Sequence, residues 1–297
     1  MAPRVIAAAL TVIGVLGVAA CGTSAATSTD GRIPVVTSTD VWGSVVSAVG
    51  GGNVDVTAII DNPSQDPHDY QSSPADAVKI NAARLALYNG DGYDDFFAAD
   101  LKATPSPSRA TIVAFALAEQ AANANEHVFY DLPTVVRVAD AVAAQLGRIQ
   151  PAHASTFRQN AAAFDKSVNG LLATVRQIGV RHSRKQVVVT EPVADYLLTA
   201  AGIADATPPA FERAVESDTD IPVAAISAAT DLITKRQVAA LINNVQTVTN
   251  VTSQLATTAR KSNVPVVQVT ETLPADVSGY LPWMTSEVNA LAAAMGS

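Results

Sequence analysis

The sequence predicts an α/β protein of two lobes with mostly parallel sheets, joined by one long helix. Three observations favour this fold. The chain of 297 residues exceeds the usual size of one domain, so two lobes are expected. From Ile33 onward, short runs rich in Val and Ile alternate with helix-like segments, which is typical of parallel strands covered on both faces. In the middle of the chain, apolar residues recur at helical spacing over a long stretch.

Most of the predicted strands are short, continuous and apolar, as buried strands are. They are Ile33–Thr37, Val54–Ile60, Arg84–Tyr88, Thr111–Leu117, Gln186–Thr190, Val238–Asn243 and Val264–Val269. The helices predicted between and after them are Val41–Val49, Pro74–Ala83, Tyr93–Lys102, Pro192–Ala201, Pro222–Thr234, Val251–Arg260 and Glu287–Met295. This alternation predicts mostly parallel sheets.

The central segment predicts two consecutive helices. The first is Pro133–Leu146, which Gly147 ends, and the second begins at Pro151, because proline suits the first position of a helix. Residues 151–178 would form a rod about 42 Å long at 1.5 Å per residue. A coiled-coil seam is the alternative, but the repeat is short for one, so we interpret this segment as a helix that crosses between the lobes. Its apolar stripe consists of Phe157, Ala161, Phe164, Val168, Leu171, Val175 and Ile178.

Composition and charge restrict the class of function. Apolar residues make up 48% of the chain and charged residues 15%, which indicates folded cores rather than disorder. The formal net charge of −8 argues against nucleic acid as a partner, because its binding needs a basic surface. An acidic protein is compatible with a cation as ligand.

The amino end predicts secretion. Arg4 is followed by an apolar run, Val5–Ala20, which is shorter than the roughly 20 residues that span a bilayer and is typical of a signal peptide. Cys21 is the single cysteine of the chain and directly follows this run, as in a bacterial lipobox, so we expect lipidation there. A buried cysteine and an uncleaved anchor are the alternatives. The expected organisation is a signal peptide (1–20), a lipidated tether (21–32), an amino-terminal lobe (33–150), the connecting helix (151–178) and a carboxyl-terminal lobe (179–297).

A loop after the second predicted strand contains the first candidate for ligand binding. It reads DNPSQDPHDY and places His68 between Asp66 and Asp69. In open parallel sheets, ligands bind beyond the carboxyl ends of the strands, where this loop lies. A single histidine is more often a surface residue than a ligand. The question is whether other ligands converge on the same place.

Three more side chains have a similar position. His127 precedes the helix that starts at Pro133, whereas Glu191 and Glu271 directly follow two strands of the second lobe. If the strands are parallel, these side chains and His68 face one cleft between the lobes. Two imidazoles and two carboxylates suit a first-row divalent metal. Asp66, Asp69 and Asp131 are expected to hold the imidazoles, since a ligating histidine normally gives its other N–H to an oxygen.

Each of these residues also has a simpler interpretation. His127 could pack under Tyr130, and Glu191 could be the favourable negative charge at the start of the helix that follows. Glu271 could be an exposed loop carboxylate, which is the usual fate of a glutamate. Recurrence of such residues at strand ends favours the metal site over these readings.

The order of the motifs resembles a known family. The signal and lipobox, DPHDYQSSPAD, LYNGDGYDD, EHVFYDLP and VTEPVADYL are similar to the metal-binding lipoproteins of bacterial ABC importers, the zinc/manganese solute-binding family. The resemblance spans nearly all of the mature chain. It implies two α/β lobes joined by a long helix, a metal buried between them, and no catalysis. It also implies a lipid-anchored monomer outside the cytoplasm that delivers its ion to a membrane permease driven by a separate ATPase.

The resemblance also implies the ligand set. The histidines of the family fall on His68 and His127, its third ligand falls on Glu191, and its fourth, usually Asp, falls on Glu271. Glu in place of a third His favours Mn²⁺ or Fe²⁺, but the Irving–Williams order still favours Zn²⁺ over Mn²⁺. The cargo is therefore left open between Zn²⁺ and Mn²⁺, with Fe²⁺ as a further possibility. The competing functions are a metallohydrolase that uses the same residues and a surface adhesin. No HExxH or GxSxG motif supports an enzyme.

Overall fold

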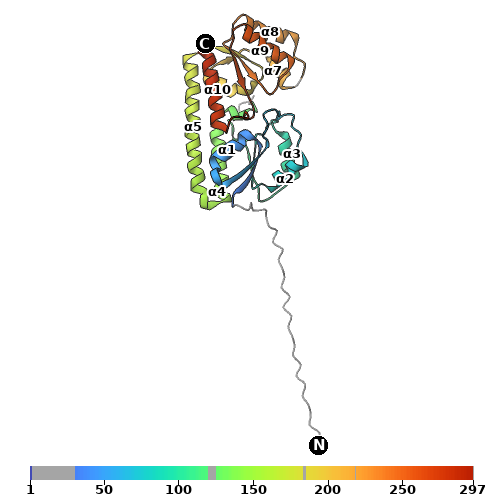
Figure 1. Ribbon diagram of the computed structural model, residues 1–297, viewed down its shortest axis with the longest axis vertical. Coiled ribbons are helices and arrows are strands. Elements are labelled where there is room, and N and C mark those ends of the chain that lie inside the picture. The colour runs from blue at the N-terminus through green and yellow to red at the C-terminus, as the bar shows by residue number, and fades with distance from the viewer. Residues whose placement is uncertain (2–30, 120–124, 183–184, 218, 297) are drawn as a thin grey trace.

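Two separate sheets lie one above the other along a single long helix (Figure 1). This is the computed structural model of the chain, and it describes Met1 and residues 31–119, 125–182, 185–217 and 219–296. The predicted signal peptide, the lipidation site Cys21 and most of the predicted tether lie outside these residues. Within the described residues, no helix has both the length and the apolar character needed to cross a membrane.

The amino-terminal lobe is a four-stranded sheet in the order β2-β1-β3-β4, with every pair parallel. Its strands are β1 (Ile33–Thr39), β2 (Val54–Ile60), β3 (Leu85–Tyr88) and β4 (Ala110–Val113). The helices of this part are α1 (Asp40–Gly50), α2 (Pro74–Ala82), α3 (Asp95–Ala103) and α4 (Leu132–Ile149). Since all strands are parallel, their carboxyl ends meet at one edge of the sheet, which faces the other lobe.

The carboxyl-terminal lobe repeats this arrangement with the order β6-β5-β7-β8, again parallel throughout. Its strands are β5 (Gln186–Val189), β6 (Ala204–Asp205), β7 (Ala240–Asn244) and β8 (Val266–Val269). Its helices are α6 (Asp195–Ala201), α7 (Pro209–Glu216), α8 (Val223–Thr234), α9 (Asn250–Lys261) and α10 (Tyr280–Met295). Both lobes therefore confirm the predicted parallel α/β class.

The connecting helix is α5 (Ala154–Arg181), preceded by a 3₁₀ turn at Pro151–His153. It runs along both lobes beside α10 and packs against α1 and α4 at one end and α6 at the other. Its buried stripe uses Leu172, not Leu171 as expected from the sequence. At Gly179 a Cβ atom would lie 1.7 Å from the carbonyl oxygen of Ala201, so only glycine allows this close approach to α6.

Several element boundaries differ from the prediction for local reasons. The helix expected to start at Glu287 begins at Tyr280, since Pro282 is tolerated in a first turn. The strand expected to reach Leu117 ends at Val113 because its partner β3 ends at Tyr88, and a 3₁₀ turn follows. The short strand β6 and helix α7 were not predicted.

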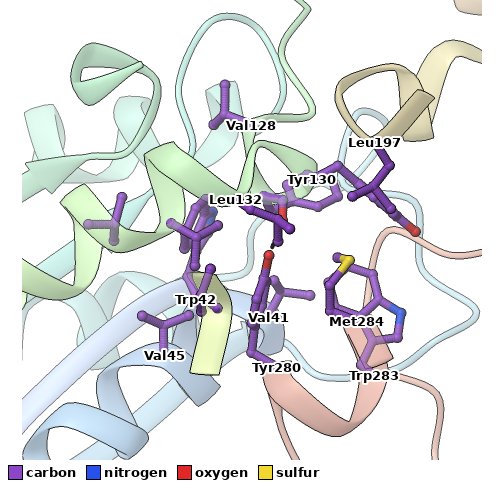
Figure 2. Close-up of a cluster of buried hydrophobic side chains, with 14 of the residues drawn as sticks. Val41, Trp42, Val45, Val128, Tyr130, Leu132, Leu197, Tyr280, Trp283 and Met284 are labelled. Carbon is purple, nitrogen blue, oxygen red and sulfur yellow. Dashed lines mark hydrogen bonds between the residues drawn. The ribbon is translucent and has the colours of Figure 1, made fainter. Parts of the chain in front are cut away.

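One apolar cluster joins the two lobes behind the cleft (Figure 2). Trp42 of α1 and Tyr130 of the amino-terminal lobe pack in it with Tyr280, Trp283 and Met284 of α10. Hydrogen bonds cross the same contact: the Tyr280 hydroxyl donates to the Phe129 carbonyl oxygen, and the Tyr130 hydroxyl donates to the Thr270 carbonyl oxygen, both at 2.8 Å. This continuous core holds the lobes in a fixed relation.

Candidate metal centre

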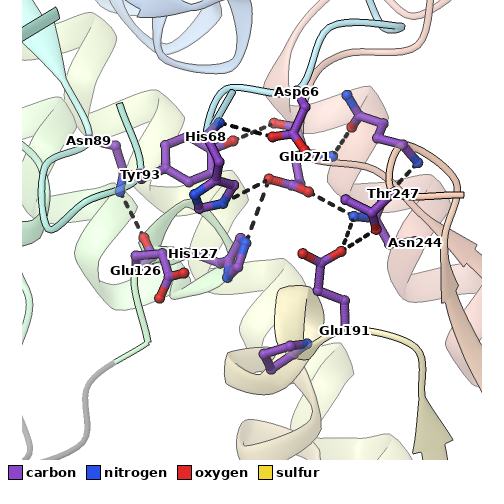
Figure 3. Close-up of polar contacts among 12 residues, drawn as sticks. Asp66, His68, Asn89, Tyr93, Glu126, His127, Glu191, Asn244, Thr247 and Glu271 are labelled. Atoms are coloured by element: carbon purple, nitrogen blue, oxygen red, sulfur yellow. Dashed lines mark hydrogen bonds and ion pairs between the residues drawn. The ribbon is translucent and has the colours of Figure 1, made fainter. Parts of the chain in front are cut away.

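The carboxyl ends of strands from both lobes surround one polar cluster (Figure 3). Glu191 follows β5, Asn244 ends β7, and Glu271 follows β8. His68 comes from the loop after β2, and His127 lies just before the 3₁₀ turn η3 (Val128–Tyr130). The structure thus brings the residues predicted from sequence to one region between the lobes.

The loop that holds His68 is fixed at both ends by its own side chains. At its start, the Asn62 side chain accepts a hydrogen bond from the Ser64 amide at 3.0 Å. At its end, Ser73 and Asp76 form a capping box on α2, with reciprocal contacts of 2.9 and 3.3 Å. Between them, Asp66 accepts the backbone N–H of His68 at 2.9 Å. The backbone is therefore set, while the His68 side chain remains 29% exposed.

Two buried atoms at the centre of the cluster face each other without hydrogen bonds. His127 Nε2 lies 3.6 Å from Glu271 Oε2, which is too long for a hydrogen bond, and neither atom has a partner among the described residues. The side chains are 1% and 0% exposed. His68 Nε2 lies 3.8 Å from the same oxygen. Two imidazole nitrogens therefore flank one carboxylate oxygen, and the space between them can take a small cation.

Glu191 is linked to this centre through Asn244. The Asn244 side-chain nitrogen donates to Glu191 Oε2 at 2.6 Å and to Glu271 Oε1 at 2.7 Å. The Thr247 hydroxyl also donates to Glu191 Oε2. Glu191 is buried, at 4% exposure. The two carboxylates are thus held side by side by one amide.

Asn125 orients His127 and was not predicted from the sequence. Its side-chain oxygen lies 2.7 Å from His127 Nδ1 and also accepts the backbone N–H of His127 at 2.8 Å. Since this oxygen can only accept there, Nδ1 carries a proton and Nε2 points at Glu271. The Asn125 amide also donates to the carbonyl oxygen of Pro192 across the lobes at 2.7 Å. The available sequence signal was a short amide side chain two positions before the histidine.

The three aspartates expected to hold the imidazoles have different surroundings. Asp66 groups with His68 and Glu271, with donor atoms within 4.8 Å of one another. Asp69 lines the nearby pocket. Asp131 instead accepts a hydrogen bond from the Thr134 hydroxyl and lies 3.6 Å from the Arg137 guanidinium, at the start of α4.

Glu126 is a further carboxylate of the cluster that sequence reasoning missed. One of its oxygens lies within 4.8 Å of nitrogens of His68 and His127. Its backbone carbonyl accepts the Asn89 side chain at 2.8 Å, which places it at the turn after β3. The sequence EH was visible, but adjacent residues in a loop do not reveal which side chain faces inward.

Burial and ion pairing together set the charges at the centre. Burial lowers the pKa of His127, but the pairing with Glu271 outweighs it and raises the pKa to about 9. Burial raises the pKa of Glu271, but His127 and His68 outweigh that effect and lower it. The pKa of Glu191 is raised, first by burial and then by the charge of Glu271. These shifts favour a proton on His127 beside Glu271, and an entering metal must displace that proton.

A pocket of about 370 Å³ leads to this centre from the surface between the lobes. Carboxylates of Asp66, Asp69, Glu126 and Glu191 line it, so its potential attracts cations. Ala214, Val215, Thr219 and Ile221 form another part of its wall. The first two of these lie near the end of α7.

Comparison with known proteins decides the family. Residues 35–294 match the model of the family described as zinc-uptake complex component A, periplasmic. The chain belongs to this family. This confirms the resemblance seen in the sequence motifs. The match covers both lobes and the connecting helix of this chain.

Individual relatives and a solved structure agree with the family. The manganese ABC transporter substrate-binding lipoprotein PsaA of Streptococcus pneumoniae is 24% identical over 222 residues, which cover 67% of this chain and 69% of PsaA. The iron-binding protein YfeA of Yersinia pestis is 30% identical over 154 residues, 49% of this chain and 50% of YfeA. The periplasmic zinc-binding protein TroA of Treponema pallidum has the same fold, with a TM-score of 0.74 at 20% identity, covering 89% of this chain and 99% of TroA.

Proposed function

We propose that this protein captures a divalent transition metal outside the cytoplasm and delivers it to an ABC importer. His68, His127, Glu191 and Glu271 are its ligands in this proposal. Zn²⁺ and Mn²⁺ are the foremost candidates and Fe²⁺ is a third, in keeping with a zinc family and with relatives named for manganese and iron.

The observation that carries the proposal is a pair of buried atoms, His127 Nε2 and Glu271 Oε2, which make no hydrogen bond among the described residues. Buried polar atoms in folded proteins nearly always have partners, so two that face each other at 3.6 Å call for a missing one. A divalent cation bound to both would satisfy the nitrogen lone pair and the carboxylate charge together. His68 would bind from the exposed side and Glu191 from the neighbouring strand end.

The surroundings suit a carrier better than an enzyme. His127 and Glu271 are sealed from solvent, whereas a catalytic metal keeps a position open to water and substrate. His68 is the partly exposed member of the set, so it is the natural point of entry and release.

The proposal includes the location and partners expected from the sequence. Lipidation of Cys21 would anchor a monomer to the outer face of the cell membrane, near a permease and its ATPase subunit. Relatives named as ABC transporter substrate-binding lipoproteins support this assignment.

Metal-dependent thermal stability tests the proposal. A ligand that binds the folded state raises the melting temperature once its concentration exceeds the dissociation constant. We expect the chelator-treated protein to gain stability with Zn²⁺ and Mn²⁺, and we expect His68→Ala to lose this gain. His153→Ala, in the 3₁₀ turn before α5, is the matched control and should keep it. A full metal-dependent shift in His68→Ala would show that the site lies elsewhere.

A further inference from the structure

We propose that Asn244 makes this site selective for a four-coordinate ion, Zn²⁺ in preference to Mn²⁺, by occupying one oxygen of each acidic ligand. The inference rests on the proposed function, because it concerns the same carboxylates. It assigns a specificity-determining role to a side chain that is not one of the four proposed ligands.

Asn244 has a central position among the strand ends. It ends β7, which lies between β5 and β8 in the sheet, so its neighbours on the two sides are the carboxylates that follow those strands. The residue is 1% exposed. Its backbone is also fixed, because the N–H of Asn244 donates a hydrogen bond to the Thr190 hydroxyl at 2.9 Å. The side chain is therefore fixed between Glu191 and Glu271 (Figure 3).

The hydrogen bonds divide the carboxylate oxygens into two kinds. Asn244 engages Glu271 Oε1 and Glu191 Oε2, and Thr247 engages Glu191 Oε2 a second time. Glu271 Oε2 faces the imidazoles of His68 and His127 at 3.8 and 3.6 Å and has no hydrogen-bond partner among the described residues. Glu271 thus has one oxygen held by the protein and one that faces the imidazoles, and Glu191 has one oxygen held by two donors.

This division limits the number of donor atoms. A carboxylate that binds an ion through both oxygens must turn both toward it, which would bend or break the bond to Asn244. Hydrogen bonds to charged groups are stronger than neutral ones, and in this buried place the amide has no water to replace them. Each carboxylate therefore contributes one oxygen, and the two imidazoles contribute one nitrogen each.

Four donors of this kind fit zinc. Zn²⁺ is usually tetrahedral with nitrogen and oxygen ligands. Mn²⁺ is typically bound by six donors that are mostly oxygen. Removing the hydrogen bond to Glu271 would free its second oxygen as a fifth donor. Removing the hydrogen bonds to Glu191 as well would free a sixth. The fit to Mn²⁺ should improve in those two steps.

Measured dissociation constants for Mn²⁺ and Zn²⁺ test this inference. Asn244→Leu keeps similar volume and removes the donor, and Asn244→Leu with Thr247→Val frees both carboxylates. We expect the ratio of the Mn²⁺ to the Zn²⁺ constant to fall about tenfold in the first variant, the equivalent of one hydrogen bond to a charged group, and further in the second. Asn243→Ala is the matched control: Asn243 precedes Asn244 on β7 and faces the opposite side of the strand, so the ratio should stay unchanged.

Absorption spectra of bound Co²⁺ provide a readout that a structural role would not move. We expect the intense bands of four-coordinate Co²⁺ in the unaltered protein and weaker bands, typical of higher coordination, in the variants. A weak spectrum in the unaltered protein overturns the inference, whatever the variants do. If Asn244→Leu does not fold, Asn244→Ser serves as the second variant. An unchanged ratio and spectrum in variants that bind metal also overturn it, but leave the proposed function intact. Failure of the unaltered protein to bind any of these ions overturns both.

Discussion

The interface between the lobes has two ends that are built in opposite ways. The apolar end, formed by Tyr130, Tyr280, Trp283 and Met284, is fully buried, with the Trp283 ring centroid 5.2 Å from that of Tyr130 and 5.7 Å from that of Tyr280. The polar end, formed by His68, His127, Glu191 and Glu271, faces a pocket and includes one partly exposed side chain. One end joins the lobes permanently, and the other is left for a ligand.

This difference indicates where movement is expected. The apolar end and α5 together resist a wide opening of the lobes, because both would have to expose apolar surface. At the polar end, amide side chains already fix three of the four residues by hydrogen bonds. Asn125 contacts His127, and Asn244 contacts both Glu191 and Glu271. Movement on cargo binding should therefore concentrate on the partly exposed His68 side chain. Scattering curves of metal-free and metal-loaded protein should differ little.

The largest effect is expected from breaking the apolar end. Trp283 is 1% exposed and donates a hydrogen bond to the Thr270 hydroxyl at 2.9 Å. Trp283→Ala should lower the free energy of unfolding by about 3–5 kcal/mol, as for other large buried aromatics. Urea denaturation measures it, and Val223→Ala at an 81% exposed position is the control with little expected change. A loss below about 1 kcal/mol would mean that this end does not hold the lobes.

The next largest effect is expected from removing the buried nitrogen of the polar end. His127→Ala should weaken metal binding by more than about 100-fold. This exceeds the usual loss on removing a residue that only hydrogen-bonds to a metal ligand. Stability without metal should also fall, because the variant leaves the buried Glu271 carboxylate without its cationic partner. Isothermal titration with Zn²⁺ measures the affinity. An affinity within tenfold of the unaltered protein would contradict the assignment of this ligand.

A smaller effect is expected from the amide behind His127. Asn125→Ala removes the acceptor that fixes Nδ1–H and should weaken metal binding about 10- to 100-fold. Asn125→Asp keeps an acceptor there and should retain more of the affinity than Asn125→Ala. The same titration compares the two variants. Equal losses in both would show that the acceptor oxygen is not what orients the ring.

The smallest effect, taken per pH unit, concerns Glu287 at the apolar end. Burial raises the pKa of the Glu287 carboxyl from 4.5 to about 8, although Trp283, the Thr270 backbone and Tyr130 favour its charge. A carboxyl whose folded pKa is raised adds stability below its unfolded pKa and loses it as pH rises. Stability should thus fall by about 1.4 kcal/mol per pH unit between pH 4.5 and 8. Glu287→Gln should flatten this slope in thermal melts, and a slope that persists would assign it to other groups.

The sequence revealed the polar end better than the apolar one. His68, Glu191 and Glu271 could be placed because each follows a strand, and parallel strands send such residues to one edge. The roles of Asn125 and Glu126 could not be predicted, since they depend on side-chain directions in a loop that has no periodicity. The role of Asn244 depends on which carboxylates lie beside the end of its strand. The apolar end was missed in part because α10 begins at Tyr280, seven residues before the predicted start, so Tyr280 and Trp283 were read as loop.

The direction of β1 has a consequence for a protein fixed to a surface. The chain enters the fold at Ile33, and β1 then runs through the lobe for seven residues toward the cleft. The amino end of β1 is therefore at the opposite pole from the pocket mouth, separated from it by at least about 20 Å of strand. If Cys21 carries the proposed lipid anchor, the pocket mouth would face away from the membrane, toward arriving ions. Delivery to a membrane permease would then require the folded body to tilt, and the length of chain between Cys21 and Ile33 would limit that tilt.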